Sequence, residues 1–250
     1  MIGFYTLFYK EIIRFIKVSF QTILAPVLLA ILYLIIFGSV LQNNVQIYTG
    51  ISYNSFLIPG LVMMSILQNA FSNPSSSLIQ SKITGSIIFI ILSPLSKTQI
   101  FFGYTLAGAF RGLVVGLGVL VTTVIFVKIH LYSILWILIF AVLSSWILSI
   151  MGLIAGIIVE KFDQLAAFQN FLIMPATMLA GVFYSINNMP YYAKIIAHFN
   201  PFFYMVDGFR YGFLGVGDIN IYISLLVSTI TLAILSIICI HLLKRFYKTS

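Results

Sequence analysis

The chain has 250 residues, of which 61% are apolar and only 7% are charged, with 13 basic and 5 acidic side chains. A soluble domain of this length carries about a quarter of its residues as charges, so the composition excludes an ordinary water-soluble enzyme. The formal net charge of +8 does not indicate nucleic-acid binding, because the basic residues are scattered over short connections instead of gathering on one soluble face. We therefore expect an all-α integral membrane protein.

Six apolar stretches are each long enough to cross a bilayer, which takes about 20 helical residues. They lack the alternating polarity of barrel strands, so each is predicted to be a helix. Asn73, Pro74 and the serines after them are predicted to end the second span. The stretches cover residues 21–41, 55–76, 100–127, 133–159, 165–186 and 222–243, and residues 1–250 thus form one transmembrane domain.

The basic residues predict the orientation of these spans, since Lys and Arg gather on the cytoplasmic side of membrane proteins. With the N-terminus placed inside, nine basic residues fall in inner connections. Only Lys128, Lys194 and Arg210 fall in outer ones, and Arg111 lies inside a span. We therefore expect a multi-pass protein of the bacterial cytoplasmic membrane with both termini in the cytoplasm.

Residues 1–19 are predicted to form an amphipathic helix that lies on the inner membrane surface. The alternative interpretation is that this segment is simply the charged start of the first span. Pro26 favours a separate helix, because it then falls early in the span that follows. One arc of the helix would carry Phe4, Phe8, Ile12, Phe15 and Ile16, and the opposite arc would carry Lys10, Arg14 and Lys17.

The inner connection at residues 80–98 has an apolar middle. Lys82 and Lys97 bound it, whereas residues 87–92 have the sequence IIFIIL. This run is too short to span a membrane. It must therefore lie in the membrane interface or pack against a partner protein.

The outer connection at residues 187–221 is the longest and is rich in aromatic side chains and proline. An apolar segment of this kind is predicted to form short re-entrant helices that enter the membrane partway, where protein buries their ends. Asp207 and Arg210 lie three residues apart, a spacing at which helical side chains can pair. We expect this pair to tie the outer gate together, with contact to substrate as the alternative role.

Ionisable groups at bilayer depth mark membrane enzymes and proton-coupled carriers. All five acidic residues here are expected in connections or at helix ends. The sequence contains no phosphate-binding loop of the form G-x-x-x-x-G-K-[ST] and no His-Glu-x-x-His metal pair. We therefore predict no catalytic residue and no cofactor or metal ligand, so a pump would need another polypeptide to hydrolyse the nucleotide.

Arg111 is the one charged residue expected well inside a span. A guanidinium at that depth costs a few kcal/mol unless it reaches toward the headgroups or faces a partner. Two interpretations therefore stay open. Arg111 either snorkels to the cytoplasmic leaflet or faces the protein interior near the translocation path or inner gate.

Glycines four residues apart occur on two of the predicted spans, a spacing that lets helices approach closely in lipid. Such a stripe serves either packing within the chain or an interface between subunits. The stripes consist of Gly108, Gly112 and Gly116 on the third span, and of Gly152 and Gly156 on the fourth.

Six short motifs follow one another in a specific order. They are FLIPGLVMM at 56–64, LSPLS at 92–96, GY at 103–104 with RG at 111–112, GVFYS at 181–185, NPFFY at 200–204 and GFRYGFLG at 208–215. In their order and spacing they resemble the membrane subunits of type-two ABC exporters, in particular the branch of YadH-like inner-membrane permeases. The resemblance runs over nearly the whole chain.

The resemblance implies a homodimer of six-helix subunits, embedded in lipid and bound to two cytoplasmic ABC subunits that hold ATP and Mg²⁺. ATP-driven alternating access would then export a lipid, a polysaccharide or a drug-like compound. A secondary transporter or channel that works without ATP is the competing hypothesis. Neither hypothesis includes a nucleic-acid partner.

The resemblance also assigns roles to particular residues. Within the connection at 80–98, it maps about residues 82–95 onto a coupling helix that docks on the ATPase, although the usual glutamate of that segment is missing from residues 88–94. The ATPase-coupling residues it implies are Lys82, Gly85, Phe89, Leu92 and Pro94. The charges discussed above and the motif at 200–204 together give the residues predicted for the translocation path or its gates, which are Arg111, Asn200, Pro201, Asp207 and Arg210.

Overall fold

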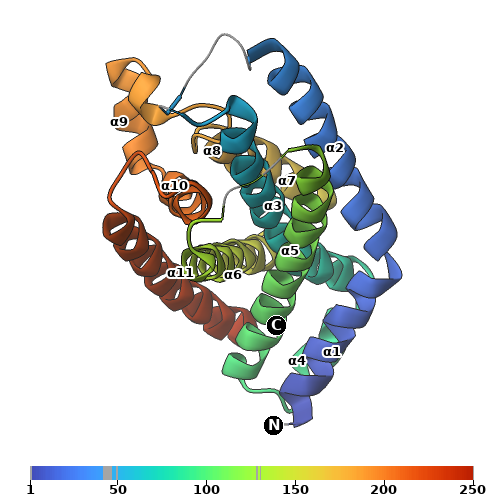
Figure 1. The fold of residues 1–250 in the computed structure, drawn as a ribbon. Coiled ribbons are helices and arrows are strands. Elements are labelled where there is room, and N and C mark those ends of the chain that lie inside the picture. The colour runs from blue at the N-terminus through green and yellow to red at the C-terminus, as the bar shows by residue number, and fades with distance from the viewer. Residues whose placement is uncertain (1, 42–46, 49, 128, 130, 250) are drawn as a thin grey trace.

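The computed structural model describes residues 2–41, 47–48, 50–127, 129 and 131–249. Residues 42–46 and 49 of the predicted outer connection at 42–54, and Lys128, which is predicted to lie outside, are not described. Within these residues every regular element is a helix, as expected (Figure 1). The helices are α1 (Ile2–Lys17), α2 (Ser19–Leu41), α3 (Tyr53–Ile83), α4 (Ile87–Ile91), α5 (Lys97–Phe126), α6 (Ile134–Ile158), α7 (Phe162–Phe168), η1 (Gln169–Ile173), α8 (Met174–Met178), η2 (Ile186–Asn188), α9 (Tyr191–Phe199), α10 (Pro201–Leu214) and α11 (Ile221–Thr249).

Five helices in the described part of the chain are long and apolar enough to cross a membrane: α2, α3, α5, α6 and α11. They match five of the six predicted spans. The end of the bundle that carries α1, α4 and the last turns of α11 is called the inner end below. The opposite end, with α9 and α10, is called the outer end (Figure 1).

Helix α3 is the centre of the bundle and packs along α5 and α6. Both glycine stripes lie at these contacts. A methyl group placed on Gly112 would lie 2.8 Å from the carbonyl oxygen of Ile66, and Gly152 lies directly against the carbonyl oxygen of Phe71. The glycines therefore serve close packing within the chain.

The predicted end of the second span at Asn73 and Pro74 is wrong, because α3 continues to Ile83. Pro74 supplies no N–H to the helix, yet neighbouring helices bury it and prevent the helix from opening. Two of the serines bond back to the helix, with Ser75 Oγ donating to the Phe71 carbonyl at 2.8 Å and Ser76 Oγ to the Ser72 carbonyl at 2.6 Å. The serines thus lie inside the helix.

The fifth predicted span, residues 165–186, is not one continuous helix. The helical run that starts at Phe162 contains a π-turn, in which the Met174 N–H bonds to the Gln169 carbonyl, and it ends at Met178. Pro175 interrupts the regular bonding, because it has no N–H. The chain then turns at Gly181, whose φ of 76° suits glycine.

This interrupted segment still lies alongside α3. The Phe168 ring stacks on Phe71 at 5.7 Å, and further along a methyl group on Gly60 would lie 2.6 Å from the Val182 carbonyl oxygen. Gly60 is nearer than Phe71 to the outer end of α3, so the segment runs from the inner toward the outer end.

Helix α1 runs beside the inner half of α5, with Leu7 against Gly103 and Phe15 facing Arg111. Its buried face consists of Leu7, Glu11 and Phe15, whereas Ile16 is exposed. The predicted apolar arc therefore does not lie on one buried face, because Phe15 is buried and Ile16 is exposed. Glu11 lies buried in the middle of α1 and Asp207 lies buried within α10, so the expectation that all five acidic residues lie in connections or at helix ends is wrong for both.

Candidate functional site

At the inner end, α4 carries apolar side chains on the surface of the molecule. Phe89 is 76% exposed and Leu92 is 77% exposed, and none of the five residues of α4 is buried. The chain enters α4 through a turn at Gly85, whose φ is 73°. It leaves through Pro94 toward Ser96, which caps α5.

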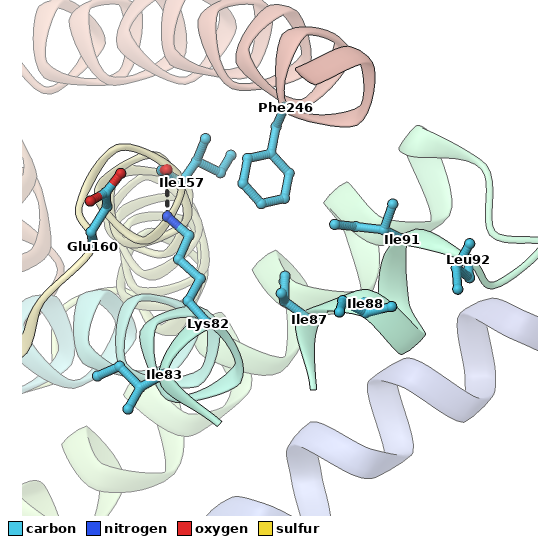
Figure 2. Close-up of a pocket in the computed structure, with 9 residues that line it drawn as sticks. All are labelled: Lys82, Ile83, Ile87, Ile88, Ile91, Leu92, Ile157, Glu160 and Phe246. Carbon is cyan, nitrogen blue, oxygen red and sulfur yellow. Dashed lines mark hydrogen bonds between the residues drawn. The ribbon is translucent and has the colours of Figure 1, made fainter. Parts of the chain in front are cut away.

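A groove of about 620 Å³ separates α4 from the inner ends of α3, α6 and α11 (Figure 2). Lys82 and Leu92 line it, together with Glu160 and Phe246. The Lys82 side chain points toward the end of α6, because its Nζ donates to the Ile157 carbonyl at 2.7 Å and to the Val159 carbonyl at 2.8 Å. Lys82 therefore satisfies carbonyl groups at the C-terminal end of α6.

A second groove, of about 750 Å³, lies on the other side of α4, between it and α1. Phe89 and Pro94 line it, with Gly3, Lys10 and Gln99. The structure thus gathers the five predicted coupling residues around one short helix. Lys82 and Leu92 line the first groove, Phe89 and Pro94 line the second, and Gly85 forms the turn before α4.

At the outer end, Arg210 is completely buried. Its Nη2 donates to the Gly181 carbonyl at 2.6 Å and to the Val182 carbonyl at 3.4 Å, and its guanidinium lies 3.8 Å from the centre of the Phe56 ring. Arg210 therefore joins α10 to the turn after α8 and to α3.

The predicted ion pair between Asp207 and Arg210 is wrong. Ion pairs join Lys10 and Arg14 to Glu11, but none joins Asp207 to Arg210. Asp207 instead accepts hydrogen bonds from the backbone N–H groups of Asp218 at 2.8 Å and Ile219 at 3.2 Å. The two side chains diverge because each has backbone partners in a different loop.

Asp218 is a site residue that the sequence did not indicate. Its carboxylate accepts hydrogen bonds from the Tyr48 hydroxyl at 2.7 Å, the Ile186 N–H at 2.9 Å and Asn187 Nδ2 at 3.1 Å. Burial and the neighbouring Asp218 carboxylate raise the pKa of the Tyr48 hydroxyl, which keeps it a donor. Its position in the polar turn GDIN, between two apolar helices, was the available signal.

Asn200 joins the ends of two helices. Its Oδ1 accepts a hydrogen bond from the Phe202 N–H at 3.0 Å and so caps α10, where Pro201 occupies the first helical position. Its Nδ2 donates to the Ala176 carbonyl at 2.6 Å, near the end of α8. Asn200, Asp207, Arg210 and Asp218 are called the outer polar network below.

Arg111 lies apart from that network, nearer the inner end, and faces the protein interior. Its Nη1 donates to Asn73 Oδ1 at 3.4 Å, and Arg14 Nη2 donates to the same oxygen at 3.0 Å. Buried Glu11 accepts hydrogen bonds from Arg14 Nε at 3.2 Å and from Ser77 Oγ at 2.7 Å. Glu11, Arg14, Asn73 and Arg111 are called the inner arginine cluster below.

Between Ser55 and Gln80, the side of α3 that is not buried is polar. Between Ser55 and Gln80, five residues of this helix are not buried, and all carry amide or hydroxyl groups. They are Gln68, Asn69, Ser72, Ser76 and Gln80. Their spacing of three or four residues places them along one face, so the central helix offers a hydrogen-bonding stripe at membrane depth.

Comparison with known proteins gives a consistent result. The sequence profile described as "ABC-2 type transporter" matches residues 3–214. The chain is 35% identical over 236 residues to the inner membrane transport permease YadH of Escherichia coli K12, covering 94% of this chain and 92% of that protein. It is 21% identical over 230 residues to nodulation protein J of Rhizobium leguminosarum, covering 92% of this chain and 89% of that protein.

Proposed function

This chain belongs to the family of ABC-2 type transporters and is a membrane subunit of an ABC transporter, and on that premise we propose that it is an exporter driven by ATP. A separate cytoplasmic subunit binds and hydrolyses ATP with Mg²⁺. Two copies of this chain form the membrane part, in the cytoplasmic membrane of a bacterium. The cargo is a lipid, a polysaccharide or a drug-like compound.

The observation that carries this proposal is the exposed apolar surface of α4. Leaving Phe89 and Leu92 in water costs free energy, which a partner surface recovers when it covers them. The Gly85 turn and the cap at Ser96 fix the position of α4 at the inner end. The ATP-binding subunit is the partner that the family membership supplies.

In this proposal the chain crosses the membrane six times, with both termini in the cytoplasm. The contacts of Phe168 with Phe71 and of Val182 with Gly60 support a crossing by the interrupted segment α7–η1–α8. The aromatic helices α9 and α10 then re-enter the membrane from outside and close the path. Helix α1 lies at the inner interface.

The polar stripe on α3 supports a translocation path beside this helix. An apolar protein in lipid gains nothing by leaving amide and hydroxyl groups open, so the stripe is suited to a polar passage between two subunits. ATP binding closes the cytoplasmic subunits, α4 transmits the movement, and the bundles switch between inward-open and outward-open arrangements.

Phe89→Asp tests this proposal. We expect the ATP-binding subunit to be lost when the membrane subunit is purified, while insertion into the membrane is unchanged. Phe199→Asp is the matched control, because Phe199 is also highly exposed but lies on α9 at the outer end. Equal recovery of the ATP-binding subunit with both variants contradicts the proposal and favours a carrier or channel that works without ATP.

A further inference from the structure

The inner arginine cluster holds more positive than negative charge. Arg14 and the neighbouring Lys10 each lie within 4 Å of the single carboxylate of Glu11, and Arg111 adds a further positive charge beside Asn73. Arg14 and Arg111 also donate to the same amide oxygen of Asn73, so their like charges lie close together. Such a pair is stabilised by a further anion.

Arg111 has hydrogen-bonding capacity to spare. A guanidinium has five N–H groups, and the contact to Asn73 at 3.4 Å is long. Its Nε is buried without a hydrogen-bond partner among the described residues. The same is true of Nδ2 of Asn73, a residue that is completely buried. Donors thus remain for a ligand that carries oxygen atoms.

The hydrogen bonds of Arg14 show that it has a different role from Arg111. Arg14 binds Glu11, and its Nη2 donates to the Asn73 carbonyl at 2.6 Å, so it fastens α1 to α3. Arg111 adds little to that fastening. A charged side chain at this depth costs free energy, so a second function for Arg111 accounts for its presence.

An apolar groove of about 640 Å³ begins one turn beyond Arg111 on α5. It lies between α2 and α5, with Leu24 and Val27 on one wall and Val114 and Leu117 on the other. Val114 is three residues after Arg111, so both side chains lie on the same face of α5. The cationic cluster therefore adjoins a groove of the size and polarity that suit an acyl chain.

We propose that Arg14, Arg111 and Asn73 bind the anionic phosphate ester of an amphiphile whose apolar chain lies in the groove between α2 and α5. Guanidinium groups match phosphate oxygens in geometry and charge. The site lies in the inner half of the bundle, since Asn73 precedes the end of α3 by ten residues, or about 15 Å. In an exporter, such a site is where an anionic lipid-like cargo first binds.

The test measures binding of short-chain phosphatidylglycerol to the purified full chain in neutral detergent, without the ATP-binding subunit. Short-chain diacylglycerol with the same acyl chains is the neutral comparison that lacks a phosphate, and inorganic phosphate is the soluble comparison. We expect phosphatidylglycerol to bind at least about tenfold more tightly than diacylglycerol. Competition by inorganic phosphate would show that the phosphate group itself is recognised.

Arg111→Gln is expected to lower the affinity for phosphatidylglycerol about tenfold. Lys161→Gln, which removes one exposed charge elsewhere at the inner end, should not change it. Leu117→Ser should weaken binding of phosphatidylglycerol but not of inorganic phosphate. Arg111→Lys keeps the charge and should retain part of the affinity, which covers the case in which Arg111→Gln fails to fold.

Two results overturn the proposal. One is equal affinity for the anionic and the neutral lipid in the native chain. The other is an equal loss of affinity with Arg111→Gln and Lys161→Gln, which would indicate general attraction to surface charge. Both concern the membrane subunit alone, so they are independent of the Phe89→Asp test for the ATP-binding subunit.

Discussion

At the outer end of this protein, buried polar side chains of α10 bind the backbone of nearby loops, whereas at the inner end the short helix α4 has no buried residue. Asp207 and Arg210 are buried and bond only to backbone groups of loops that follow α8 and α10. Phe89 and Leu92 at the inner end lie mostly outside the packed core. Hydrogen bonds within the chain thus hold α10 at the outer end, whereas in the proposed function a partner covers α4 at the inner end. The exposed Phe199 on α9 shows that apolar exposure alone does not distinguish the two ends.

The largest loss of stability is expected from Arg210→Met at the outer end. The change leaves the Gly181 and Val182 carbonyls without their donor inside the protein, and the free energy of unfolding should fall by about 3 kcal/mol. Thermal unfolding in detergent measures it. Lys194→Met, at a partly exposed position on α9, is the control and should have little effect.

Exchange of the two charges gives a sharper form of that test. In the double variant Asp207→Arg with Arg210→Asp, the charges are reversed but neither side chain finds its backbone partners. We expect no rescue relative to the single changes. Recovery of stability in the double variant would indicate a direct ion pair.

A smaller loss is expected from Asp218→Ala. The Tyr48 hydroxyl, the Ile186 N–H and the Asn187 amide lose a shared acceptor, which should cost about 2 kcal/mol because part of this site is reached by water. The same unfolding measurement applies. A loss larger than that of Arg210→Met would reverse the order of importance within the outer polar network.

Lys82→Met tests the inner end and should lower the free energy of unfolding by about 1 kcal/mol. It removes the donor for two carbonyls at the end of α6 but keeps the apolar part of the side chain. Unfolding of the isolated membrane subunit measures this loss. An unchanged stability would show that water replaces the amine at these carbonyls.

The smallest effect on stability is expected from Phe89→Ala, within about 0.5 kcal/mol, because the side chain packs little in the isolated subunit. The same variant should weaken binding of the ATP-binding subunit in a pull-down. A large loss of stability in the isolated chain would contradict the contrast between the two ends.

The sequence predicted those features that depend on composition over many residues. Apolar length located five spans, and the run IIFIIL located the exposed surface around α4. Local rules failed where neighbouring helices decide the outcome. Pro74 does not end α3, because packing holds the helix closed, whereas Pro175 and Gly181 interrupt the fifth predicted span.

The polar partners were the least predictable part of the site. Spacing along one helix suggested that Asp207 binds Arg210, but each side chain reaches a loop that is distant in the sequence. Nothing in the sequence indicated the polar contacts of Glu11 and Asn73, because these contacts depend on the approach of α1, α3 and α5. Only the folded chain brings these groups together.

The hydrogen bonds of Lys82 have a mechanical consequence. Lys82 lies near the end of α3, just before the turn into α4, and its amine holds the end of α6. Nearer the middle of the bundle, Gly152 and Gly156 allow α6 to pack closely against α3. We therefore expect a displacement of α4 to move the inner ends of α3 and α6 together, and Phe56 near the outer end of α3 lies against Arg210 of the outer polar network.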